Sequence, residues 1–384
     1  MAGARVLRAL KLSLLHASRA CGVFRAAANS RRRTEKLLIL CYHGISMDDE
    51  HEWAPGLFMS ATMFETRLQG LRRGGYSVLP LGEAVAQLYA GTLPPRSVVI
   101  TFDDGNLDFY RRAWPLLKAY EQPATVYLTT YYCEQNLPVF PLVLSYLLWK
   151  GRGQLVEGAI GAARKLTVDT RSIDGRRRAE AILLGQAQDA GMSAREKDDL
   201  ARGVANALRI DYDELGARRL LHIMNPDEVR ELAAEGVDFQ LHTHRHRSPL
   251  DESRYRAELT SNRERLTAMT GKVPRHFCYP SGTRKPQFET WLDEEGVLSA
   301  TTCDPGIASR TNHPLRLPRL LDHSTLTGVE FDAWLSGIGA RLPHRPIGNQ
   351  DVDHDGRLMI APLPAPGSAA GLDRAGDSSE PVHA

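Results

Sequence analysis

The apolar run Val98-Val99-Ile100 leads directly into Thr101-Phe102-Asp103-Asp104-Gly105. The run predicts a buried strand that ends in two adjacent carboxylates, and α/β enzymes keep their chemistry at this carboxyl edge of the sheet. Because neighbouring residues of a strand point to opposite faces, one carboxylate can bind a metal while the other transfers a proton. Asp-Asp-Gly is also common in solvated turns, so this segment alone leaves both interpretations open.

Three histidines crowd five positions further along the chain. Residues 237–241 predict a second strand, which runs into His242-Thr243-His244-Arg245-His246. Two imidazoles and a carboxylate form a typical catalytic metal site, with positions left for water and substrate. His242 and His246 would meet on one face if the segment turns helical after the strand, and His244 would then point elsewhere. The alternative is a basic surface loop with incidental histidines.

A third segment reads Arg275-His276-Phe277-Cys278-Tyr279-Pro280-Ser281-Gly282. It predicts a short strand running into a Pro-Gly turn, after a helix that Gly271 closes as its C-terminal cap. By itself, this pattern is ordinary loop chemistry.

In this order, the three segments resemble the polysaccharide deacetylase family, the NodB-homology domain of the carbohydrate esterases (family 4) that remove N-acetyl groups. The family's first motif, Thr-Phe-Asp-Asp-Gly, stands at 101–105, and its second, His-Ser/Thr-x-x-His, stands at 242–246. The third, in the variant that ends Tyr-Pro-x-Gly, stands at 275–282. The likeness extends from residue 40 to about residue 338. It implies the family's distorted (β/α)7 barrel, with a helical insertion in this chain.

The resemblance also implies one divalent metal ion, with zinc expected first and cobalt or another divalent metal as alternatives. Its ligands would be Asp104, His242 and His246. Asp103 would be the catalytic base, acting on a water whose pKa such a metal lowers to roughly 7.

Further roles follow from the same resemblance. Arg275 would orient Asp103 and favour its ionised form. The backbone N–H of Tyr279, which precedes Pro280, would help to stabilise the oxyanion.

The family's general acid is a histidine in a Leu-x-His motif, which Leu321-Asp322-His323 fits. His313 lies nearby and is an alternative, and Arg319 could be structural or functional. His43 lies just past the first predicted strand, 37–41, and would stand at the rim of the site or serve as a structural histidine.

Composition limits the other classes of function. The 384 residues, 42% of them hydrophobic, can bury one large core, which predicts a single catalytic domain over 35–340 with a helical insertion over about 134–223. The net charge of +2 gives no indication of nucleic-acid binding. Five scattered cysteines do not form a disulfide framework and favour a reducing compartment. Residues 345–384 are predicted to be disordered.

Residues 1–34 contain eight Arg or Lys and no Asp or Glu. Their apolar stretches are too interrupted for a clear signal peptide, so we expect a cytoplasmic enzyme or one at the inner face of the membrane. Leucines at helical spacing predict a helix on an anionic membrane surface, with its basic side toward the lipid headgroups. A basic helix packed on the enzyme and a disordered leader are the alternatives.

The sequence therefore predicts metal-dependent hydrolysis of an N-acyl amide on an amino sugar, in a glycan or a lipid-linked precursor. A non-sugar amide hydrolase of the same fold and a non-catalytic glycan-binding relative are the rivals. The sequence does not indicate the oligomeric state.

Overall fold

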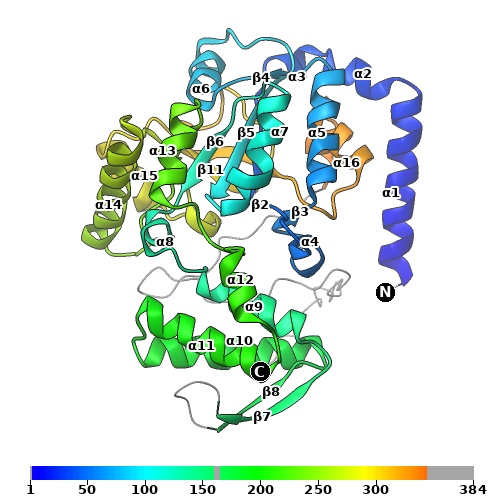
Figure 1. Ribbon diagram of the computed structural model, residues 1–384. Coiled ribbons are helices and arrows are strands. Elements are labelled where there is room, and N and C mark those ends of the chain that lie inside the picture. The colour runs from blue at the N-terminus through cyan, green and yellow to red at the C-terminus, as the bar shows by residue number, and fades with distance from the viewer. Residues whose placement is uncertain (1, 160–164, 344–384) are drawn as a thin grey trace, which may run out of the picture.

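A closed barrel of parallel strands forms the centre of the protein. The structure, a computed structural model, describes residues 2–159 and 165–343 (Figure 1). Among these residues, seven strands close the barrel in the order β1 (Leu38–Tyr42), β12 (Leu317–Leu321), β11 (Ser299–Pro305), β10 (His276–Cys278), β9 (Asp238–Leu241), β6 (Thr125–Leu128) and β5 (Ser97–Asp104). Pairing of β5 with β1 closes the ring, and the short strand β4 (Ser77–Val78) adds to the start of β5. The predicted (β/α)7 barrel is confirmed.

Helices cover the outside of the barrel (Figure 1). Asn225 and Glu228 form a capping box at the start of one helix, and Gly271, the predicted C-terminal cap, ends the next with φ of 70°. The covering helices are α5 (Ala61–Arg73), α6 (Leu81–Ala90), α7 (Trp114–Ala119), α8 (Thr130–Gln135), α13 (Pro226–Ala234), α14 (Glu252–Thr270), α15 (Pro286–Glu294) and α16 (Gly328–Ser336). Shorter elements are β2 (Gly44–Ile45), α4 (Glu50–Trp53), β3 (Phe58–Met59), the π-helical turn η1 (Phe109–Ala113), η2 (Pro280–Gly282), η3 (Pro314–Arg316) and η4 (Gly339–Arg341).

The insertion between β6 and α13 has its own apolar core. It consists of α9 (Phe140–Lys150), β7 (Leu155–Ala159), β8 (Lys165–Asp169), α10 (Ile173–Asp189), α11 (Ala194–Ala207) and α12 (Tyr212–Ala217). Only the antiparallel hairpin β7–β8 was not predicted, because two five-residue strands are too short to stand out from a helical pattern. The insertion returns to the barrel just past β5, where Leu107 N donates to His222 O (2.9 Å) and Met224 N donates to Gly105 O (3.0 Å). It therefore lies at the carboxyl ends of the strands.

Gly105 allows the turn after β5 to pass close to Leu128 of β6. Its φ is 84°, and a Cβ atom there would lie 2.2 Å from Cδ1 of Leu128. A side chain would therefore clash directly after the paired aspartates.

The N-terminal segment folds into α1 (Ala2–Ala20), α2 (Val23–Ala28) and α3 (Arg31–Thr34), and α1 runs beside α16 (Figure 1). Leu15 and Phe24 are buried in a small apolar cluster against α16. Basic residues of α1 also face the enzyme, through the ion pairs Lys11–Glu330 (3.0 Å) and Arg19–Asp332 (2.9 Å) and the hydrogen bond from Arg8 Nη2 to Thr325 O (3.3 Å).

Of the alternatives for this segment, the basic helix packed on the enzyme is the one found. The predicted orientation, with the basic side toward lipid, is wrong, because these basic side chains are used against α16 and the loop before it. The outer side of α1 is apolar instead. No helix among the described residues is long and apolar enough to cross a membrane. The predicted disordered tail lies outside the described residues.

Candidate active site

The three expected metal ligands come together at the carboxyl ends of β5 and β9. Asp104 Oδ1 lies 3.3 Å from Nε2 of His242 and 3.3 Å from Nε2 of His246. The Nδ1 atom of His242 lies 2.8 Å from the carbonyl oxygen of Cys278. Donation of an Nδ1–H to this carbonyl leaves the Nε2 lone pair directed toward Asp104. Two imidazole nitrogens and one carboxylate oxygen, all within 4.8 Å of one another, fit a divalent cation such as zinc.

Electrostatics keep two of the three ligands, Asp104 and His246, in the forms that bind a cation, whereas burial of His242 is outweighed by Cys278 and Asp104, which raise its pKa. Burial would raise the pKa of Asp104, but His246, His242 and His43 lower it below its usual value. Burial, partly offset by Asp104, lowers the pKa of His246 to about 4. At neutral pH, Asp104 is therefore ionised and His246 is a neutral ligand.

The loop after β9 is not helical, so the predicted helical turn is wrong. Thr243 and His246 both have left-handed backbones, with φ of 59° and 54°, and these bends bring the rings of His242 and His246 to 4.9 Å. Thr243 Oγ1 accepts from the Arg247 N–H at 3.0 Å, and His244 Nδ1 lies 2.9 Å from Thr130 Oγ1. His244 therefore holds the loop, away from the other two histidines. Left-handed non-glycine residues are costly and often mark functional sites.

Asp103 forms a buried, bidentate ion pair with Arg319 of β12. Arg319 Nη1 and Nη2 lie 2.7 Å from Oδ1 and Oδ2 respectively, and Nε donates to Thr302 O at 2.9 Å. Burial would raise the pKa of Asp103, but the Arg319 guanidinium lowers it below its usual value. The carboxylate is therefore ionised and rigidly held, as a catalytic base requires.

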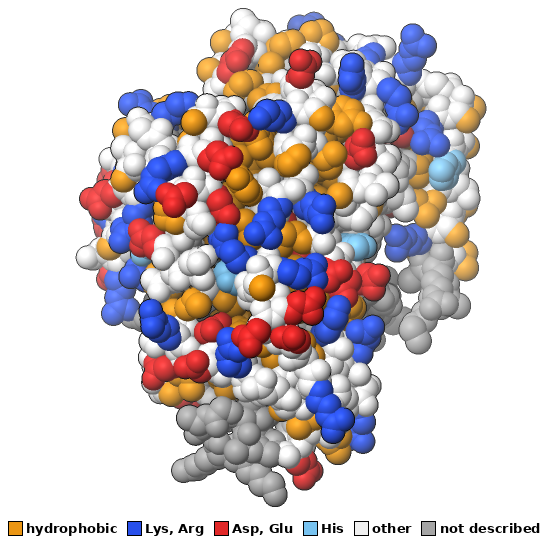
Figure 2. Space-filling view, viewed as in Figure 1, with side chains coloured by type: hydrophobic (Ala, Val, Ile, Leu, Met, Phe, Trp, Pro, Cys, Tyr) orange, Lys and Arg blue, Asp and Glu red, His pale blue; other side chains and the backbone are white. Residues whose placement is uncertain are grey.

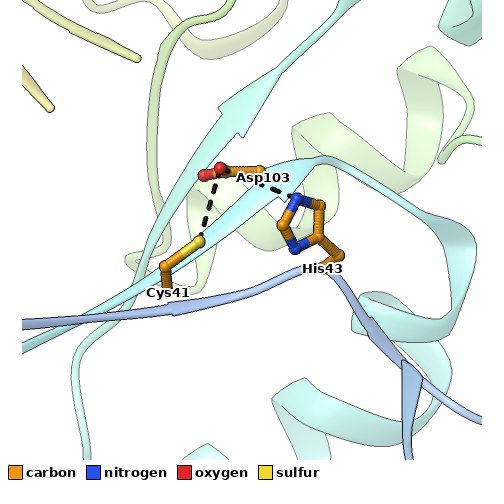
Figure 3. Close-up of side chains that lie close together, drawn as sticks. All are labelled: Cys41, His43 and Asp103. Carbon is orange, nitrogen blue, oxygen red and sulfur yellow. Dashed lines mark hydrogen bonds and ion pairs between the residues drawn. The ribbon is translucent and has the colours of Figure 1, made fainter. Parts of the chain in front are cut away.

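Cys41 of β1 and His43, which directly follows this strand, also lie next to the Asp103 carboxylate (Figure 3). Cys41 Sγ lies 3.4 Å from Asp103 Oδ2, and His43 Nε2 lies 4.0 Å from the same oxygen. The three side chains resemble a second metal site, but the guanidinium of Arg319 already supplies the positive charge there. His43 is half-buried beside Asp103, which is where a residue at the rim of the site would stand.

Arg275 does not contact Asp103, and the prediction that it orients the base is wrong. Arg275 is exposed and precedes β10, so it lies at the amino end of a strand whose carboxyl end borders the site. The guanidinium comes from β12 instead. One sequence signal pointed to it: Arg319 interrupts the apolar strand Leu317–Leu321, and a charge inside a buried strand needs a partner.

The contact expected of Tyr279 is not found either. Its N–H group donates to Thr301 O at 3.3 Å, and its hydroxyl donates to Leu315 O at 3.1 Å. Pro280, which follows, is buried and has no N–H group to offer. The N–H group that was predicted to stabilise the oxyanion is thus already used in a hydrogen bond within the barrel.

His323 follows β12 on a loop that a second buried ion pair anchors. Asp322 accepts from Arg67 Nε (2.9 Å), Arg67 Nη2 (3.1 Å) and the Tyr42 hydroxyl (3.0 Å). Burial lowers the pKa of His323, Glu330 opposes the shift, and the charges of Arg67, Arg8 and His43 lower it further. Cys41 of β1 is paired with Leu321 of β12, and His43 and His323 each follow two residues after this pair, so both lie at the same edge of the barrel.

The alternative acid, His313, has a structural contact. Its Nδ1 accepts from the Leu315 N–H at 3.2 Å and so caps the turn η3. His313 precedes β12, whereas His323 follows its carboxyl end, where the paired aspartates and histidines lie, and this position favours His323 as the acid.

The barrel and its paired aspartates and histidines define a hydrolase-type site at the carboxyl ends of parallel strands. The model of the polysaccharide deacetylase family matches residues 90–172 and 183–297, more than half of the chain. The chain therefore belongs to the polysaccharide deacetylase family.

Curated relatives match over short segments. The putative polysaccharide deacetylase YxkH of Bacillus subtilis is 37% identical over 94 residues, which span 24% of this chain and 32% of that protein. The poly-beta-1,6-N-acetyl-D-glucosamine N-deacetylase of Staphylococcus aureus is 36% identical over 72 residues, which span 19% of this chain and 25% of that protein. Less than a third of each relative is thus matched, although the matches agree with the family.

The solved structure of the Streptococcus pyogenes deacetylase PplD in complex with acetate shares the fold. The likeness has a TM-score of 0.52 at 20% identity, and it covers 79% of this chain and 98% of that one.

Proposed function

We propose that this protein is a metal-dependent hydrolase that removes an N-acetyl, or another N-acyl, group from an amino sugar in a glycan or a lipid-linked precursor. One observation carries the proposal. Asp104, His242 and His246 form a donor set directly beside Asp103, which Arg319 keeps ionised. Family membership and the sugar deacetylase named among the relatives support the choice of an acylated amino sugar.

Asp104, His242 and His246 would hold the cation. When bound, a divalent metal ion supplies Lewis-acid polarisation of the acyl carbonyl and lowers the pKa of water.

The chain's own residues move the protons. Asp103, fixed at both oxygens by Arg319, accepts a proton from the attacking water. His323 gives a proton to the departing amine, so the products are a carboxylic acid and a free amino sugar. His43 lies beside the base and limits how substrate approaches it.

Metal content and acetate release, measured on the same samples, test this function. We expect one divalent metal per chain in the wild type and acetate from N-acetylglucosamine oligosaccharides. His246→Gln should lose both. His244→Gln is the matched control, because His244 lies on the same loop and contacts Thr130 instead of Asp104. Metal without acetate from any acylated sugar would overturn the sugar substrate, and a wild type that takes up no metal would overturn the mechanism.

We also propose that α1 holds the enzyme at an anionic membrane surface, through its outer side. Val6, Leu7, Leu10 and Leu14 are 65–69% exposed and lie within one stripe of the helix. The absence of acidic residues from the sequence 2–34 favours anionic headgroups. Apolar side chains would enter the membrane while the basic side of α1 stays on the enzyme. The cytoplasmic location stays a prediction.

A further inference from the structure

A hollow of about 340 Å³ lies between the barrel and the insertion. It is lined by Met47, Arg111, Arg112 and Arg218. Figure 2 shows basic side chains gathered in the middle of this face, over the junction seen in Figure 1. Two of the arginines, Arg111 and Arg112, are consecutive on the π-helical turn η1. Such turns are rare in proteins, and those that occur are often found at functional sites.

The positive charge of this hollow is only partly neutralised. Arg111 Nη1 donates to Arg218 O at 2.9 Å, and Arg112 Nη2 contacts Met47 O at 3.5 Å. Among the residues that the structure describes, neither Arg111 nor Arg112 forms an ion pair with a carboxylate. Arg218 pairs with Asp48 at 3.1 Å and lies 3.9 Å from Glu214. Like charges placed together favour an anion between them, and guanidinium groups match phosphate oxygens bidentately.

The walls of the hollow start from the catalytic strand ends. Met47 follows His43 along the loop that contains β2, and η1 follows Asp104 of β5. Arg218 leads into residues 222–224, whose backbone is bonded to Gly105 and Leu107. An anion in the hollow would therefore sit on the same edge of the barrel as the paired aspartates.

We propose that this hollow binds a phosphate or diphosphate group carried by the acylated sugar, which selects a sugar phosphate, as in a lipid-linked precursor, over a neutral oligosaccharide. The inference rests on the proposed function for the identity of the sugar. Two guanidinium groups without a carboxylate partner match a dianion better than a single carboxylate.

Calorimetric titration tests the site without requiring turnover. The probes are N-acetylglucosamine 1-phosphate, N-acetylglucosamine and inorganic phosphate, with wild type, Arg111→Gln/Arg112→Gln and Arg72→Gln/Arg73→Gln. The last variant is the control, because Arg72 and Arg73 are also consecutive and exposed but end α5, away from the hollow. We expect the phosphorylated sugar to bind at least about tenfold more tightly than N-acetylglucosamine, and only the first variant to lose this preference.

Each outcome decides one part of the inference. Equal affinity for the two sugars, or equal losses in the two variants, would overturn the site. Binding of inorganic phosphate as tight as that of the sugar phosphate would show a site for free phosphate and overturn the role in substrate selection. A retained phosphate preference without deacetylation would overturn the proposed function alone, whereas deacetylation without the preference would overturn this site alone.

Discussion

Arg319 and Asp103 lie 216 positions apart in the chain, yet both Nη atoms of the arginine are 2.7 Å from the two carboxylate oxygens. Their strands, β12 and β5, are separated in the barrel by β1, so the ion pair crosses the barrel interior. Both members of a buried ion pair lose their hydration, which offsets much of their attraction. The pair therefore contributes mainly by fixing the geometry of the two side chains. It holds the base ionised and in one orientation beneath the metal ligands.

Replacing Arg319 by Lys should impair activity and move its pH dependence. Lysine keeps the charge but cannot bind both oxygens, so the pKa of Asp103 rises. Activity, which is lost as pH falls through this pKa, should then be lost at a higher pH than in the wild type. We expect unfolding to become easier by about 1–3 kcal/mol. The pH profile of kcat/KM and urea denaturation measure the two effects.

Arg275→Lys is the matched control, because Arg275 is exposed at the other end of β10. Its stability should change by less than about 0.5 kcal/mol, with an unchanged pH profile. A large effect at Arg275 with none at Arg319 would contradict the assignment.

Removing the charge of Arg8 should raise the pKa of His323. Burial lowers this pKa most, Glu330 raises it, and the charges of Arg67, Arg8 and His43 lower it further. A histidine that donates a proton must be charged, so activity falls as pH rises through its pKa. In Arg8→Gln, the alkaline limb of kcat should therefore move to higher pH. Rate profiles of Arg8→Gln and of Arg25→Gln, an exposed arginine of α2, decide the point. An identical limb in both variants would remove His323 as the acid.

The apolar stripe of α1 should govern membrane binding. Leu10 and Leu14 are each 65% exposed, and burying a leucine side chain contributes about 1.5–3 kcal/mol. Leu10→Gln/Leu14→Gln should therefore weaken binding to phosphatidylglycerol vesicles by roughly a hundredfold or more. Vesicle sedimentation measures this.

Ile173→Gln/Ile182→Gln is the control for nonspecific vesicle binding through exposed apolar side chains. These isoleucines are 52% and 46% exposed on α10. Equal losses in the two double variants, or no binding by the wild type, would count against a membrane role for α1.

Gly105 should tolerate alanine much less well than Gly236 does. Both have positive φ, of 84° and 98°, so each substitution costs about 1–2 kcal/mol from the backbone. Only at Gly105 would the added Cβ meet another atom, Leu128 Cδ1, at 2.2 Å, which should cost a further 1–3 kcal/mol or so. Urea denaturation of Gly105→Ala and Gly236→Ala measures the difference, and equal losses would show that Leu128 moves freely.

Local signals in the sequence were enough to predict much of the fold. Apolar runs predicted the strands β1, β5 and β9, and Gly271 marked a helix end, because each feature depends on a few neighbouring residues. The grouping of Asp104 with His242 and His246 came from the resemblance to the family, and the structure brings the three side chains together.

The features that were missed depend on distant contacts or on single backbone angles. The partner of Asp103 depends on which side chain of β12 points into the barrel toward β5. The third motif contains Arg275 but gives no information on how β12 is aligned with β5. Thr243 and His246 adopt left-handed backbone conformations although neither is a glycine, so the residue types gave no indication of these bends. The N–H of Tyr279 was expected to be free, but the pairing of β10 with β11 uses it.

The late position of β12 in the chain also determines when the enzyme becomes active during its synthesis. A nascent chain that has emerged only through β11 already carries the metal ligands and Asp103, but its barrel is open and its base has no guanidinium partner. Release of residues 317–321 from the ribosome supplies both the closing strand and Arg319 in one step. Truncation before this strand would therefore leave a chain with all three family motifs and no competent base.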